Sequence, residues 1–314
     1  MRRLSPTHAR VLALVLATCS LVSAAASAQR ARQGLLSLED ARLFYEVMGT
    51  GEPIIVVHGG PGLDHAYLRP GLDALATRNT VIYYDQRGTG RSTAELVETA
   101  INLDAFVDDI DALRQALGYE RVSVLGHSFG SLIATEYAAR YPDNLRSLIL
   151  MNPVEPGARF RELTEERQRA RTTEEDSAEM EELTSSEGFA ARDPATLSQV
   201  YRVAFRQAFR DRDLIDQLDL DLATSTAKNG QDVAALLGAS LGTVDWWHRL
   251  AEIEVPTLVL HGRYDTPPVD MSRELAEAFP AGSFAVLNSG HFPYLEDRSG
   301  LLSAISGFFA GLGR

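Results

Sequence analysis

Cysteine is almost absent from this 314-residue chain. The one cysteine, Cys19, lies within the first 28 residues, which we expect to be removed from the mature protein. A mature chain without cysteine can form no disulfide, and it supplies neither a thiol nucleophile nor thiolate ligands for a metal.

Basic residues are also few in relation to acidic ones. The chain has 30 lysines and arginines against 43 aspartates and glutamates, a formal net charge of −13. The first 28 residues hold three arginines and no acid, so the mature chain would carry 27 basic and 43 acidic residues, a net charge of −16. Such a charge argues against nucleic acid or an anionic membrane surface as a partner. It favours a soluble protein and, weakly, a cationic substrate.

The first 28 residues have the pattern of a secretory signal peptide. A basic start is followed by the apolar stretch Val11–Val22 and by Ala26-Ser27-Ala28, which fits a cleavage site before Gln29. We therefore expect an exported protein, periplasmic or secreted, without membrane contact after cleavage. The alternatives are an uncleaved membrane anchor, for which the apolar run is short, and lipidation at Cys19, for which Thr18 is a poor fit.

Continuous apolar, β-branched runs recur along the rest of the chain and are typical of strands buried on both faces of a parallel sheet. Amphipathic helical patterns lie between them, and the clearest begins at Asn102, a good N-cap, and is closed by Gly118. This alternation predicts an α/β fold with a mostly parallel, doubly wound sheet. The predicted strands are 42–47, 54–57, 80–84, 121–125, 145–151, 256–260 and 283–287.

The alternation stops between residues 155 and 247, where no convincing buried strand occurs. This region is rich in charged residues, but apolar residues recur at helical spacing from Leu197 to Phe209, and Trp246 and Trp247 need burial. We therefore prefer a helical cap, inserted before the last strands, to a disordered acidic linker. The predicted domains are a signal peptide (1–28), a core (29–154 and 248–314) and a cap (155–247).

A candidate nucleophile stands where one of the apolar runs meets a helical pattern, in Gly126-His127-Ser128-Phe129-Gly130. A serine on a tight strand-to-helix turn projects its hydroxyl above the sheet edge, and the flanking glycines let strand and helix pack closely. The helix also directs its N-terminal N–H groups at an oxyanion formed there. We therefore predict that Ser128 is a nucleophile, the alternative being a chance serine in a glycine turn.

A serine nucleophile needs a base, and the base needs an acid that orients it. Position argues against five of the six histidines after residue 28 and leaves His291, which follows a strand at the edge where open α/β sheets place their sites. Asp265 follows the preceding strand, so the order along the chain is Ser128, Asp265, His291. Asp270 is an alternative acid, but an N-cap role at the next helix suffices for it.

An oxyanion formed at Ser128 needs two N–H donors. The backbone N–H of Phe129, next after the nucleophile, is one. The loop His58-Gly59-Gly60-Pro61-Gly62 follows a predicted strand, and its glycines let the backbone approach a substrate carbonyl. We choose the Gly60 N–H as the second donor, the alternative being a plain glycine turn.

Three motifs together resemble one family. His58-Gly59-Gly60-Pro61-Gly62, the stretch from Asp85 to Ser92 (DQRGTGRS) and Gly126-His127-Ser128-Phe129-Gly130 are similar to those of the proline iminopeptidases and related serine aminopeptidases of the α/β-hydrolase fold. The resemblance runs from about Leu43 to Arg314 and is weakest in the cap. It implies Ser128, Asp265 and His291 as a catalytic triad, Gly60 and Phe129 as the oxyanion hole, and a structural role for residues 85–92.

The resemblance implies release of an N-terminal residue, often proline, from a short peptide through an acyl-enzyme, without metal or cofactor. Such an enzyme holds the free ammonium of its substrate, usually with carboxylates of the cap, but the family's amine-binding Glu has no match in this cap.

The alternatives are a carboxylesterase or other small-molecule hydrolase with the same triad, and a non-catalytic binding protein on this fold. A carboxylate pair in the pocket favours the peptidase and a wholly apolar cap face the esterase. An aspartate in place of Ser128 would indicate a dehalogenase or epoxide hydrolase.

Overall fold

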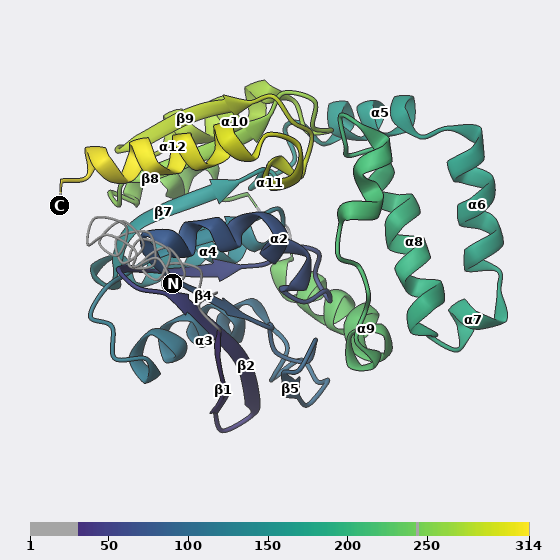
Figure 1. Ribbon diagram of the computed structural model, residues 1–314, viewed down its shortest axis with the longest axis horizontal. Helices are drawn as coiled ribbons and strands as arrows, with labels where there is room; N and C mark the ends of the chain where they lie inside the picture. The colour runs from purple at the N-terminus through teal and green to yellow at the C-terminus, as the bar shows by residue number, and fades with distance from the viewer. Residues whose placement is uncertain (1–30, 243–244, 314) are drawn as a thin grey trace, which may run out of the picture. The chain divides into compact units, whose positions relative to one another are not determined.

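The computed structural model describes residues 31–242 and 245–313, and the segment assigned to the signal peptide lies outside these ranges. Within them the strands form one nine-stranded sheet in the order β1-β2-β4-β3-β6-β7-β8-β9, with β5 paired to β2 (Figure 1). The pairs from β4 through β3, β6, β7 and β8 to β9 are parallel, whereas β2 pairs antiparallel with β1, β4 and β5. The strands are β1 (Arg32–Ser37), β2 (Ala41–Gly49), β3 (Glu52–Val57), β4 (Asn79–Tyr84), β5 (Thr93–Ala94), β6 (Val122–His127), β7 (Leu145–Met151), β8 (Thr257–Gly262) and β9 (Gly282–Leu287).

The prediction of a mostly parallel, doubly wound sheet is therefore confirmed. Every predicted strand has its counterpart, and alternate residues of the central strands face opposite layers: Ile55 and Val57 pack under one set of helices, Ile54 and Val56 under another. This two-sided burial explains why the strands are continuous apolar runs. On one side lie α3 (Leu103–Ala116), α4 (Gly130–Arg140) and α10 (Val269–Ala278), and on the other α2 (Arg69–Leu72) and α12 (Arg298–Gly311).

The helix predicted after Asn102 is α3. The Asn102 side chain accepts a hydrogen bond from the Ala105 N–H at 3.0 Å, and Gly118 closes the helix with a φ of +77°. Phe106, Ile110 and Leu113 are buried against the sheet. The N-cap, the apolar stripe and the closing glycine therefore act as the sequence indicated.

Between β7 and β8 the chain is helical: α5 (Arg161–Arg171), α6 (Glu174–Thr184), α7 (Glu187–Ala190), α8 (Pro194–Arg206) and α9 (Thr224–Leu241). In Figure 1 α5 to α8 lie beyond the carboxyl end of β7, whereas α9 runs back beside the core. Val233 and Leu237 of α9 are fully buried in the same apolar cluster as α3 and α4. No helix of the described residues is both long and apolar enough to cross a membrane. The remaining elements are η2 (Ala66–Leu68), η3 (Asp73–Thr77), η4 (Pro142–Asn144), η5 (Arg212–Gln217), η6 (Trp247–Glu252) and α11 (Pro293–Glu296).

Candidate active site

Ser128 stands on the turn between β6 and α4 with a φ of +52°, in the left-handed region that costs a residue with a side chain about 1–3 kcal/mol. Its own N–H donates to the Met151 carbonyl at 3.0 Å, which fixes the turn to β7. The glycines on either side allow this approach: a Cβ on Gly126 would lie 2.6 Å from the Gly130 carbonyl oxygen, and one on Gly130 would collide with the backbone of β3. The strained turn predicted at Ser128 is present.

Asp265 and His291, which are 26 residues apart, come together at the carboxyl ends of β8 and β9. The Nδ1 of His291 lies 2.8 Å from Oδ2 of Asp265. Because an ionised carboxylate only accepts, Nδ1 carries the proton and Nε2 is left as the basic nitrogen. His291 and Ser128 line one cavity, so the structure brings the three predicted residues to the same site.

Burial alone would raise the pKa of Asp265, which is fully buried, but the neighbouring charge of His291 and the hydrogen bonds to His291 and Asn152 lower it to about 2. The carboxyl group is therefore ionised at neutral pH. An ionised carboxylate in this position can stabilise an imidazolium on His291.

Asn152 is a residue that the sequence analysis did not identify. Its amide donates to Oδ2 of Asp265 at 2.7 Å and to the Gly290 carbonyl at 3.1 Å, and its φ is +47°. The Thr266 N–H donates to the other carboxylate oxygen of Asp265 at 2.7 Å. Asn152 follows β7 directly, and its place at a strand carboxyl end was the available clue, since asparagine tolerates the left-handed region well.

The loop with the predicted oxyanion donor Gly60 lies against Ser128, because a Cβ on Gly59 would be 2.7 Å from Cβ of Ser128. The Gln86 N–H donates to Nε2 of His58 at 3.1 Å, so Nδ1 of His58 carries the proton and donates to the Gly59 carbonyl at 3.0 Å. In a trans peptide the carbonyl and the following N–H point in opposite directions. The bond to His58 therefore directs the Gly60 N–H to the opposite side.

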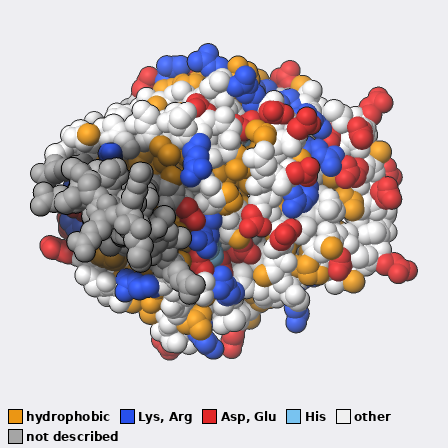
Figure 2. Space-filling model, in the orientation of Figure 1, with side chains coloured by type: hydrophobic (Ala, Val, Ile, Leu, Met, Phe, Trp, Pro, Cys, Tyr) orange, Lys and Arg blue, Asp and Glu red, His pale blue; other side chains and the backbone are white. Residues whose placement is uncertain are grey.

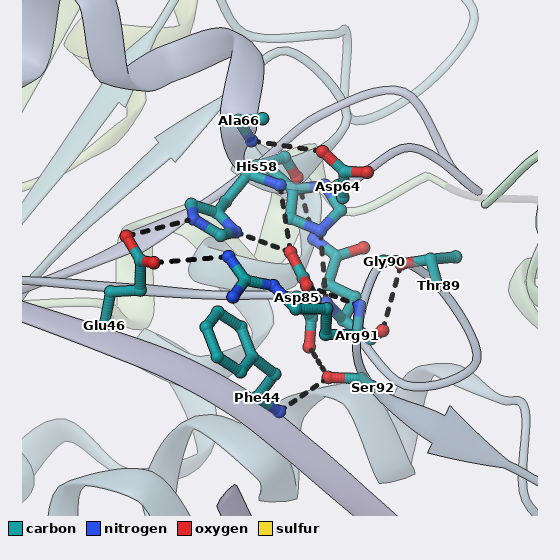
Figure 3. Close-up of polar contacts among 12 residues, drawn as sticks. Phe44, Glu46, His58, Asp64, Ala66, Asp85, Thr89, Gly90, Arg91 and Ser92 are labelled. Carbon is teal, nitrogen blue, oxygen red and sulfur yellow. Dashed lines mark hydrogen bonds and ion pairs between the residues drawn. The ribbon is translucent and has the colours of Figure 1, made fainter. Parts of the chain in front are cut away.

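The stretch from Asp85 to Ser92 packs against this loop and is held by a network of polar contacts (Figure 3). Oδ1 of the buried Asp85 lies 2.5 Å from Nδ1 of the buried His65, and Oδ2 accepts from the Arg91 N–H at 2.7 Å. Nε2 of His65 faces Glu46 at 3.7 Å, and Glu46 in turn pairs with Arg69 at 2.6 Å. The structural role that the resemblance implied for residues 85–92 therefore has a physical basis.

A cavity of about 370 Å³ opens over Ser128 and His291. Most of its wall is apolar, as at Val154, Phe205 and Pro267, but Glu155 and Glu165 also line it. Oε2 of Glu155 accepts from the Phe160 N–H at 3.0 Å, whereas Oε1 is buried without a protein partner among the residues described. A buried carboxylate oxygen without a donor is energetically costly.

The helical region between β7 and β8 is hydrogen-bonded to the loops of the site at two places. The His291 N–H donates to the Ala208 carbonyl at 2.8 Å, and the Glu296 carboxylate accepts from the N–H groups of Gly290, Arg210 and Asp211 at 2.5 to 3.0 Å. At the other place, the α9 hydroxyl of Thr226 donates to Oδ2 of Asp64 and accepts from the Gly90 N–H, both at 2.9 Å. A Cβ on Gly62 would collide with the Gly230 carbonyl of α9.

Other candidates of the sequence analysis lie elsewhere. The N-cap role assigned to Asp270 is wrong: Pro268 holds that position of α10, and Asp270 is exposed in the first turn, 3.8 Å from Arg273. The acids of α6 other than the buried Asp176 belong to the charged surface at the right of Figure 2. Within the described ranges no group of three or more His, Cys, Asp or Glu side chains is arranged to hold a metal ion.

The parallel sheet, the strained serine turn and the His–Asp pair define an α/β hydrolase. The chain belongs to that family, whose model, described as alpha/beta hydrolase fold, matches residues 52–298. Among the relatives, a proline iminopeptidase of Heyndrickxia coagulans is 29% identical over 287 residues, 88% of this chain and 98% of the relative. A putative carbamate hydrolase of Azorhizobium caulinodans is 29% identical over 253 residues, 80% and 88% of the two chains. The crystal structure of a proline iminopeptidase from Mycobacterium smegmatis is similar with a TM-score of 0.66 and 26% identity, covering 90% of this chain and 98% of the other.

Proposed function

We propose that the protein is an exported serine aminopeptidase, similar to proline iminopeptidases, that releases the N-terminal residue of short peptides. Residues 155–247 form its cap. Ser128 attacks the carbonyl of the first residue, and His291 accepts the hydroxyl proton and returns it to the leaving amine. Asp265 holds the imidazole in the required tautomer. The N–H groups of Gly60 and Phe129 stabilise the tetrahedral oxyanion. Water then attacks the acyl carbonyl, which releases the residue as a free acid and restores the Ser128 hydroxyl.

The observation that carries the peptidase proposal is the free carboxylate oxygen of Glu155. Glu155 lines the same cavity as Ser128, close to the end of β7, and its other carboxylate oxygen is held by the backbone N–H of Phe160. The α-ammonium of a peptide supplies the N–H donor and the positive charge that this oxygen lacks. Glu165, exposed on α5, is a second acid at the same cavity, but Arg161 also lines the cavity and Arg169 lies 3.7 Å from Glu165, so the proposal rests on Glu155.

An esterase or carbamate hydrolase is the second candidate. The apolar part of the cavity wall suits an acyl chain, and one of the relatives is named a putative carbamate hydrolase. The chemistry at Ser128 is the same in both cases. The two functions differ in whether Glu155 binds a positively charged amine.

The test compares Pro-, Ala- and Leu-arylamides, with free and with acylated amines, against p-nitrophenyl acetate and butyrate. Glu155→Gln should lower kcat/KM for the free-amine arylamides roughly 10- to 100-fold, the value of one charged hydrogen bond, and leave ester turnover unchanged. Glu162→Gln, a change of an exposed residue on α5, is the matched control. Ser128→Ala should abolish all turnover and labelling by a fluorophosphonate. Ester turnover without arylamide turnover would replace the peptidase by the esterase.

Export is tested separately. Cleavage of the full-length chain on expression in a bacterium should give a mature N-terminus at Gln29, measured by mass spectrometry of the periplasmic and culture fractions. A mature mass that includes Met1, or a lipid attached to Cys19, would contradict this part of the proposal.

A further inference from the structure

Two buried side chains beneath the nucleophile have no place in the mechanism above. Tyr67, from η2, and His127, next to the nucleophile on β6, are 4% and 1% exposed. Three hydrogen bonds form a line through them. The Gly59 N–H lies 2.7 Å from Oη of Tyr67, Oη lies 2.9 Å from Nδ1 of His127, and Nε2 of His127 lies 3.0 Å from the His291 carbonyl oxygen.

The two ends of this line fix the direction of every bond in it. The amide of Gly59 can only donate, so the Tyr67 oxygen accepts there and sends its single proton to Nδ1 of His127. The carbonyl of His291 can only accept, so Nε2 of His127 carries the proton. A neutral imidazole with the proton on Nε2 satisfies both requirements. Burial, followed by the nearby charge of His291, lowers the pKa of His127 to about 3, and the ring is therefore neutral when the enzyme works.

The line connects the two parts of the site that must be placed relative to Ser128. One end holds the N–H of the His58–Gly59 peptide, which precedes the peptide of Gly60, the proposed oxyanion donor, and the other end holds the carbonyl of His291, the proposed base. His127 also packs against the His291 ring, with centroids 4.9 Å apart. We propose that Tyr67 and His127 form a relay that positions the oxyanion loop and His291 as one unit. Both are positioning residues, because neither is expected to touch the substrate.

The proposal rests on the proposed serine hydrolase function, and its consequence is specific. Losing these hydrogen bonds leaves substrate binding in the cavity intact. It makes the positions of the Gly60 N–H and of His291, which act on the transition state, less well defined. Removal of a complete oxyanion donor costs about 10²- to 10³-fold in kcat, so misplacing one should cost roughly 10- to 100-fold. KM should stay within about twofold, because the loss concerns the transition state alone.

The test variant is Tyr67→Phe, which removes one oxygen and keeps the ring. Tyr294→Phe is the matched control: Tyr294 is also buried, its ring lies 6.0 Å from that of His127, and its hydroxyl has no partner among the residues described. Turnover of p-nitrophenyl butyrate and the rate of inactivation by a fluorophosphonate are measured for both, with the melting temperature as a check of folding. We expect Tyr67→Phe to reduce kcat and the inactivation rate by the same factor, and Tyr294→Phe to change neither.

A double variant separates a relay from two independent structural roles. His127→Phe keeps a ring at this position and removes both of its hydrogen bonds. If the two residues act in one line, Tyr67→Phe with His127→Phe should be about as slow as the slower single variant. Losses that multiply, a rise in KM with kcat unchanged, or a kcat of Tyr67→Phe equal to that of Tyr294→Phe would overturn the relay. A wild-type protein that neither hydrolyses the ester nor reacts with the fluorophosphonate would instead refute the proposed function.

Discussion

Raising the pH from about 7.5 to about 9.5 should reduce the free energy of unfolding by about 2 kcal/mol through one residue, His65. Burial alone would lower the pKa of this imidazole, but the hydrogen bonds and charges of Asp85 and Glu46 raise it to about 9, from an ordinary value of 6.5. A raised pKa in the folded state means that the stabilisation is complete below pH 6.5 and is lost as the pH rises through 9. The full shift corresponds to about 3 kcal/mol at about 1.4 kcal/mol per pKa unit, and about 2 kcal/mol of it falls within the chosen interval.

The assay is urea unfolding at both pH values, followed by tryptophan fluorescence. His65→Gln removes the titrating group, so its unfolding free energy should be lower at the lower pH and nearly independent of pH across the interval. His248→Gln, a change of an exposed histidine in η6, should retain the wild-type dependence. The buried histidines with lowered pKa values, such as His127 and His261, are neutral over this interval and contribute little. The same pH dependence in wild type and His65→Gln would refute the argument.

Three further outcomes are expected. Asp265→Asn should keep the fold but lower kcat by roughly 10⁴-fold, because the amide no longer holds the required tautomer of His291; a loss under tenfold in ester turnover would contradict the proposed acid. Gly62→Ala should lower the melting temperature more than Gly118→Ala does, because both glycines have positive φ but only the Cβ at Gly62 meets another backbone; equal losses would mean that strain alone matters. Arg87→Met should cost about 3–5 kcal/mol of unfolding free energy, because it leaves the buried Asp109, which Arg87 contacts at 2.6 and 2.8 Å, without its cation. The double variant Arg87→Met with Asp109→Leu should recover part of that loss. A double variant less stable than Arg87→Met would show that the isolated carboxylate is not the cause.

The parts of the fold that sequence analysis predicted are those in which a local pattern and its environment coincide. The strands ending at Val57 and Met151 are buried on both faces, so each reads as an unbroken apolar run. Ser128 was recognisable because the strained turn requires glycines at fixed offsets from it. The positions of Asp265 and His291 followed from the rule that strand carboxyl ends meet at one edge.

The residues that were missed are defined by contacts between distant parts of the chain. Tyr67 and His127 are 60 positions apart, and their hydrogen bond exists only because η2 packs over the end of β6. Asn152 reaches Asp265 across 113 positions because β7 and β8 are neighbours in the sheet. Glu155 has no distinguishing neighbours in the sequence, and only burial of one carboxylate oxygen separates it from the solvated acids of the same region.

The two sets of hydrogen bonds between the helical region and the site loops also determine which part of the chain could be exchanged between related proteins. Residues 207–211 are bonded to the loop of His291, and α9 is bonded to the loops at Asp64 and Gly90, so both segments help to hold the loops of the candidate site. The helices α5 to α8 bring wall residues such as Glu165 and Phe205 to the cavity. A chimera that replaces residues 161–206 would therefore exchange the cavity wall contributed by α5 to α8 and keep Glu155 and the bonds made by residues 207–211 and α9. One cut at the edges of the whole region between β7 and β8 would separate His291 from its support.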